Sequence, residues 1–217
     1  MSVRVAALGG AVFFALVLVY AGLTSGAPSA TDSRRVIFDY LTDNQGQLQL
    51  AAVVMGLAMP AALLWLSGHF QALTRAEGGT PGLALAALGG GVLTAASSVV
   101  GALVLGTTAT RVTDLGPAGA RVWWTMHLLS TGATLLGLLL LIGATAAVCL
   151  QRQLFARWFA VASVVLALAS MIGAFTIGYD TAGIQVVAGI AIVLDSVWIF
   201  LVSIFLWRDT AVARPAP

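Results

Sequence analysis

The chain has no lysine, one cysteine and two histidines, and only 8% of its 217 residues are charged. A soluble domain carries roughly 25% charged residues, so this composition excludes water as the main solvent. A single cysteine excludes an intrachain disulfide, and with two histidines it gives no spacing for a metal site. A formal charge of +2 without a basic cluster excludes nucleic acid as a partner. The glycine-rich ALGG and ALGGG lack the Walker lysine, so we expect no cofactor.

Hydrophobic residues make up 60% of the chain, and the mean hydropathy is +1.02. A membrane-spanning helix needs about 20 mostly apolar residues, and the lipid bilayer is then the main partner of the chain. Six runs of this kind predict an all-α, multi-pass helical bundle in a cell membrane, formed by one domain over residues 1–207. We expect residues 208–217 to form a disordered cytoplasmic tail. The predicted spans are 5–24, 47–67, 82–107, 122–150, 155–179 and 183–207.

Short segments with glycine, proline and polar residues separate these runs at 25–35, 76–82 and 114–119, and 151–157 predicts a tight turn. The first run is longer than the 7 to 15 apolar residues of a signal peptide, which favours a retained helix over a cleaved leader. The distribution of arginines favours both termini inside. Small residues at 90, 94, 97 and 101 predict close helix packing, and Pro60 predicts a kink.

Asp195 stands in the middle of the last apolar run, VVAGIAIVLDSVWIFLVSIFLW. It lies about 11 residues into this run, which at about 1.5 Å per residue places it near the bilayer midplane. An aspartate there costs on the order of 2.5 to 3.5 kcal/mol, so it must be neutralised, paired or hydrated. Intramembrane acids are often functional. A carboxyl that only bonds one helix to another is the alternative.

Other polar and aromatic side chains fall toward the half of the bundle remote from the termini. His127 lies between two tryptophans and a series of hydroxyl residues, and the fifth run ends in a tyrosine and an aspartate. This asymmetry predicts a cavity that opens outward or sideways into the outer leaflet. The candidate catalytic residues are Asp195, Asp180 and His127. The candidate substrate-binding residues are Trp198, Trp123, Trp124, Tyr179, Phe175, Asp39 and Asp43.

Three functions remain open at this point. A protonated Asp195 among aromatic faces is suited to acid-initiated cyclisation or isomerisation of an isoprenoid lipid, with Asp180 or His127 resetting its proton. Intramembrane acids and histidines are also typical of proton relays in small transporters, which for a chain of this size would require a homo-oligomer. The third possibility is a non-catalytic scaffold or sensor in which Asp195 joins two helices.

The segments FDYLTDNQGQLQLAAVV and LLWLSGHFQALTR, together with the last run and its acid, give the chain a layout that resembles bacterial six-helix membrane families of unknown function. In size and all-helical layout it also resembles the small integral-membrane terpene cyclases. That second resemblance implies carboxylates in an early and a late helix and an apolar substrate that arrives through the bilayer. Asp195 matches the late carboxylate. The second run carries no acid deeper than Asp43 to match the early one.

Overall fold

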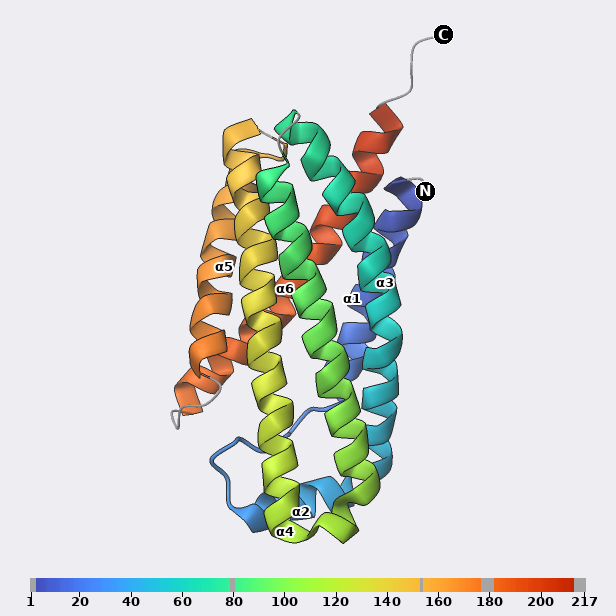
Figure 1. The fold of residues 1–217 in the computed structure, drawn as a ribbon, viewed down its shortest axis with the longest axis vertical. Coiled ribbons are helices and arrows are strands. Elements are labelled where there is room, and N and C mark those ends of the chain that lie inside the picture. Colours follow the sequence, from blue (N-terminus) through green and yellow to red (C-terminus); the bar gives the residue numbers. More distant parts are fainter. Residues whose placement is uncertain (1–2, 79–80, 153, 177–181, 213–217) are drawn as a thin grey trace.

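The computed structural model describes residues 3–78, 81–152, 154–176 and 182–212, and these residues form helices and no strand. The helices are α1 (Val3–Leu23), α2 (Arg34–Asp43), α3 (Gln45–Glu77), α4 (Gly82–Arg152), α5 (Arg157–Thr176) and α6 (Ala182–Val212) (Figure 1). All except α2 are long and apolar enough to cross a membrane. The predicted all-α membrane bundle is therefore confirmed. Helix α6 ends at Val212, and residues 213–217 of the predicted tail lie outside the described residues.

Helix α4 spans 71 residues and contains two of the predicted membrane spans. Its two arms meet at Gly116, whose φ of 61° and ψ of 177° suit glycine, because other residues rarely adopt a positive φ. Pro117 follows at the start of the second arm, where its missing N–H is harmless. The arms run antiparallel and pack closely: a Cβ added to Gly90 in the first arm would lie 2.6 Å from the carbonyl oxygen of Gly137 in the second. The small residues of the first arm serve packing, as their spacing predicts.

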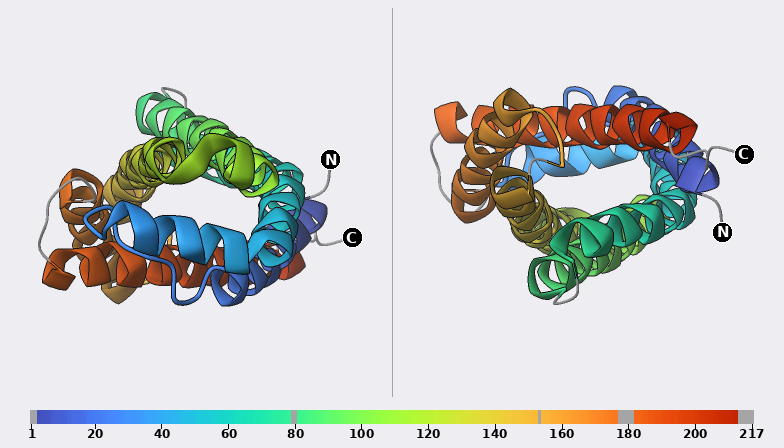
Figure 2. Two further views of the ribbon diagram at one scale, coloured as in Figure 1. Left: turned by 90° about the horizontal axis from the view of Figure 1, so that it is seen from below. Right: turned by 90° about the horizontal axis from the view of Figure 1, so that it is seen from above.

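The membrane-spanning segments form a closed ring, seen end-on in Figure 2. Helix α1 packs against α3 and α6, α3 against α4, α4 against α5, and α5 against α6. Glycines allow the tightest of these approaches. A Cβ added to Gly9 of α1 would lie 2.7 Å from the carbonyl oxygen of Ala61 in α3. Pro60 lies beside this contact, and α3 remains one helix through it.

An aromatic cluster fills the ring on the side of the two chain termini. Trp65 stacks on His69 with ring centroids 4.9 Å apart, and Trp198 meets both rings edge-on. Phe159 stacks against Trp198 at 6.1 Å. We call Trp65, His69, Phe159 and Trp198 the aromatic plug. Both termini lie at this end of the bundle, as Figure 1 shows.

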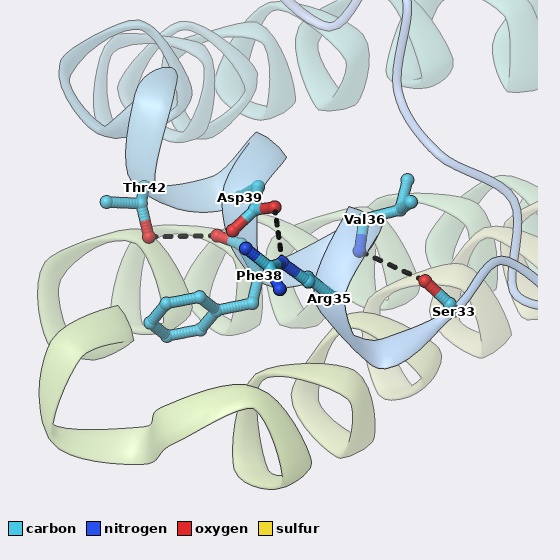
Figure 3. Close-up of polar contacts among 6 residues, drawn as sticks. All are labelled: Ser33, Arg35, Val36, Phe38, Asp39 and Thr42. Carbon is cyan, nitrogen blue, oxygen red and sulfur yellow. Dashed lines mark hydrogen bonds and ion pairs between the residues drawn. The ribbon is translucent and has the colours of Figure 1, made fainter.

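Helix α2 lies across the opposite end of the bundle (Figures 1 and 2). Ser33 caps it by accepting a hydrogen bond from the backbone N–H of Val36 at 3.3 Å (Figure 3). Ile37 and Leu41 are fully buried against α4, which holds the amphipathic helix in place. Helix α3 has 33 residues and is about 50 Å long at about 1.5 Å per residue, against a hydrocarbon thickness of about 30 Å. Helix α3 is therefore longer than the hydrocarbon it has to cross.

Candidate functional site

A cavity of about 360 Å³ lies inside the ring, between the aromatic plug and α2. Side chains from α1, α3, both arms of α4 and α6 form its wall. Its volume falls within the roughly 300 to 1,000 Å³ of small-molecule sites, and such sites are mostly apolar with a few placed polar groups. The apolar part of this wall includes Phe13, Val17, Met55, Met59, Leu138, Ile192 and Ile199.

His127 is one of the polar residues in the cavity wall, and it is buried. Its Nδ1 lies 3.0 Å from the carbonyl oxygen of Gly101, which only accepts hydrogen bonds. We therefore assign the ring proton of neutral His127 to Nδ1, which leaves Nε2 as an acceptor. The hydroxyl of Tyr20 on α1 lies 3.4 Å from Nε2 and donates to it. This long hydrogen bond joins α1 to the second arm of α4 at the cavity.

A set of hydroxyl groups follows His127 along the cavity wall. Ser130 Oγ donates to the carbonyl oxygen of His127 at 2.6 Å, and Thr134 Oγ1 donates to that of Ser130 at 3.0 Å. Thr131 and, in the facing arm, Thr94 also donate to backbone carbonyls of their own arm. Since each hydroxyl has one proton, these groups offer lone pairs to the cavity. This part of the wall is a surface of hydrogen-bond acceptors.

Asp195 enters the cavity wall from α6 and is only 1% exposed. Its carboxyl oxygens lie 3.1 and 3.0 Å from the hydroxyl of Ser170 on α5. The same hydroxyl lies 3.0 Å from the carbonyl oxygen of Leu166. A single hydroxyl proton cannot serve both acceptors fully, whereas a protonated Asp195 donates to Ser170 while Ser170 donates to Leu166. The geometry therefore satisfies all three groups when the acid is neutral.

The predicted tryptophans lie outside the cavity wall. Trp198 belongs to the aromatic plug, and its indole N–H donates to the hydroxyl of Ser163 at 2.8 Å. Trp124 packs behind His127, with ring centroids 5.3 Å apart, and donates to the carbonyl oxygen of Pro28 at 3.1 Å. Trp123 is half-buried on the same arm. Trp124 therefore positions His127, and the cavity itself takes its aromatic surface from Phe13 and Tyr20.

The remaining candidates are not brought to the cavity. Phe175 is 64% exposed on the outside of α5. Asp39 is exposed on α2 and forms an ion pair with Arg35 at 3.7 Å (Figure 3), and Asp43 is also exposed. Tyr179 and Asp180 lie outside the described residues. Of the candidate residues whose side chains are described, His127 and Asp195 are the two that share the cavity.

Two residues of the site were not found from the sequence. Tyr20 lies near the end of an apolar run, where an aromatic residue is typical of the membrane interface. Ser170 lies in the fifth run among apolar and small residues. Both are identified only once the rotation of their helices is known, and their spacing in the sequence carries no signal for it.

The cavity opens sideways between α1 and α6. These helices pack closely near the plug, where Phe14 stacks on Phe200 with centroids 5.0 Å apart, and they diverge toward α2 (Figure 1). In the divergent part, Leu18 of α1 and Val193 of α6 line the cavity and are also 46% and 41% exposed. Exposed apolar residues on a membrane bundle face lipid. We call this gap the lateral opening, and it connects the cavity with one leaflet.

Comparison of the chain with protein-family models, with curated proteins and with solved structures finds no match.

Proposed function

We propose that this protein is a multi-pass enzyme of the cell membrane that isomerises or cyclises an isoprenoid-type lipid, with Asp195 as the acid. One observation carries the proposal: Asp195 and His127, from helices far apart in the sequence, lie in the wall of the same apolar cavity. An acid held in an apolar site is neutral and able to donate a proton. The bundle supplies both that acid and space for an apolar chain.

The reaction needs no co-reactant. The carboxyl proton of Asp195 adds to a carbon–carbon double bond of the substrate and leaves a carbocation on the neighbouring carbon. Attack by a second double bond closes a ring, and loss of a proton restores an alkene. The carboxylate of Asp195 accepts that proton, so the acid is regenerated and the product is an isomer of the substrate. The faces of Phe13 and Tyr20 stabilise the cation, since aromatic faces attract positive charge.

Isotope transfer from solvent tests this proposal. Purified protein in lipid nanodiscs is incubated in D2O with linear polyprenyl lipids, and the isomers formed are analysed by mass spectrometry. With exchange of the carboxyl proton with solvent between turnovers, we expect one solvent deuterium in each product molecule from the wild type and no product from Asp195→Asn. Asp114→Asn is the matched control, because Asp114 is exposed and pairs with Arg111 at 3.3 Å outside the cavity. Full turnover by a folded Asp195→Asn protein would refute the catalytic role.

A proton-coupled carrier is a second candidate, favoured by a cavity that is open to one side and closed by the aromatic plug on the other. This form corresponds to one state of an alternating-access cycle. Six spans are few for a carrier, so a homo-oligomer would be required. If the protein is a carrier, we expect a substrate-dependent proton flux into liposomes, which Asp195→Asn should abolish. The transported substrate should be chemically unchanged.

A scaffold or sensor is the third candidate, and the hydrogen bonds between Asp195 and Ser170 favour it. Here the carboxyl only joins α6 to α5. Replacing a joined polar pair by apolar groups is often tolerated. If the protein is a scaffold or sensor, we expect the double variant Asp195→Leu/Ser170→Ala to keep its membrane level and its binding or signalling function. An enzyme with this double change would lose its turnover, and a carrier would lose its proton flux.

A further inference from the structure

We infer that the ligand of the cavity is a neutral lipid alcohol, whose hydroxyl head binds between Tyr20 and His127. The inference deepens the proposed function and rests on it for the isoprenoid nature of the lipid tail. It concerns recognition of the head group and is independent of whether Asp195 performs chemistry on the tail.

Charge excludes a phosphorylated head. The described residues that line the cavity include no arginine, and the chain has no lysine. The two arginines of α2, Arg34 and Arg35, are both exposed. Burying a phosphate in an apolar site without a counter-charge costs far more than a lipid tail regains. A diphosphate, the most common activated form of an isoprenoid, is therefore a poor ligand here.

Hydrogen bonding selects a hydroxyl. The Tyr20 hydroxyl is a donor and His127 Nε2 is an acceptor, and at 3.4 Å their mutual hydrogen bond is near the upper limit of length. A ligand hydroxyl placed between them accepts from Tyr20 and donates to His127. A carbonyl satisfies only Tyr20, and an ether likewise leaves Nε2 without a donor. An unpaired buried polar group costs about 1 to 3 kcal/mol, so the alcohol is favoured over both.

The position of the pair fits this ligand. Tyr20 lies between Leu18 and Ala21 on α1, both of which line the cavity and are exposed at the lateral opening. A lipid alcohol entering from the leaflet meets Tyr20 first. Its tail then has the apolar wall formed by Met55, Met59 and Ile192.

Binding of four farnesyl probes to the full chain in nanodiscs tests the inference. The probes are farnesol, farnesyl methyl ether, farnesal and farnesyl diphosphate, which share one tail and differ in the head. We expect farnesol to bind about tenfold more tightly than the ether or the aldehyde, which corresponds to about 1.4 kcal/mol. The diphosphate should not bind. Equal affinity for farnesol and its diphosphate, or no binding of any probe, would overturn the inference.

Variants assign the head group to its site. Tyr20→Phe and His127→Phe should each weaken farnesol binding about tenfold, and His127→Phe should not weaken binding of the methyl ether, which has no proton to donate to Nε2. Tyr40→Phe is the matched control, since Tyr40 packs on Trp124 outside the cavity, with centroids 6.0 Å apart. An equal loss for both probes in His127→Phe would mean that His127 only shapes the cavity, and it would refute recognition of the hydroxyl. Farnesol binding without deuterium uptake would refute the proposed chemistry while leaving this inference intact.

Discussion

Asp195 and Ser170 show how one hydroxyl stabilises an acid inside a membrane. Removing Ser170 leaves the carboxyl without the partner at 3.0 and 3.1 Å on α5. Hydrogen bonds between membrane helices contribute from about 0.6 to 2 kcal/mol. We therefore expect Ser170→Ala to lower the free energy of unfolding by about 1 kcal/mol, measured by denaturation in mixed micelles. Ser67→Ala is the control, because Ser67 bonds only to its own helix among the described contacts, and it should change stability by less than about 0.5 kcal/mol. No effect of Ser170→Ala would contradict the pairing.

His69 and Thr145 form a second buried polar pair, in the aromatic plug. Thr145 Oγ1 donates to the carbonyl oxygen of Leu141 at 2.8 Å, so it accepts from His69 Nε2 at 2.9 Å. Nδ1 of His69 has no hydrogen-bond partner among the described atoms. Among these atoms the His69 ring is therefore hydrogen-bonded only through Nε2, to the Thr145 hydroxyl. His69→Phe removes both the donor and the unpaired Nδ1 while keeping the ring stacked on Trp65.

A double-mutant cycle measures this pair. Thr145→Val leaves the His69 N–H unpaired in an apolar site, and we expect a loss of about 1 to 2 kcal/mol in the free energy of unfolding. The double variant His69→Phe/Thr145→Val should be closer to the wild type than Thr145→Val alone, because no polar group is then left unpaired. Strict additivity of the two single changes would show that the pair does not interact.

At the scale of the helix, the two arms of α4 depend on close backbone contact. Gly90 faces the second arm, whereas an added Cβ at Gly89 would meet nothing within 4 Å. Gly90→Leu should therefore separate the arms and prevent normal folding, through a cost of several kcal/mol from overpacking. Gly89→Leu, one position away, should fold with the same or higher stability because leucine favours the helix. Membrane level and monodispersity in detergent distinguish the two, and equal behaviour would contradict the hairpin.

The sequence predicts this hairpin well and the cavity only in part. Breaker residues at 114–119 separate the runs, and Gly116 lies among them. The rotation of each helix cannot be predicted in the same way. Residues that face lipid and residues that face the core are both apolar, so hydropathy along the helix does not show which face is buried. Trp198 is three residues from Asp195 and was expected to share its cavity, yet it packs in the plug. Tyr20, in contrast, lies in the cavity wall, although its position in the sequence does not indicate this. The sequence therefore predicts the depth of a residue in the membrane but not the side of the helix on which its side chain lies.

At the scale of the whole molecule, the ring has two unlike ends. The plug closes the end that holds both termini, where the guanidinium of Arg4 lies 5.9 Å from the ring of Trp207. The other end holds the cavity, its lateral opening and α2. A ligand therefore reaches the cavity from the leaflet nearest α2. Which leaflet this is depends on the orientation of the chain in the membrane.

The arginine bias predicts that both termini are inside, so α2 and the cavity belong to the outer leaflet. Cysteine labelling checks this orientation in a Cys149→Ala background, since Cys149 is buried and is the one native cysteine. A membrane-impermeant maleimide applied to intact cells should label Thr42→Cys on α2 and leave Gln151→Cys, at the end of α4 near the termini, unlabelled. Both positions are exposed, so both should react after the cells are permeabilised. The reverse pattern would place the cavity in the inner leaflet and its lipid supply on the cytoplasmic side.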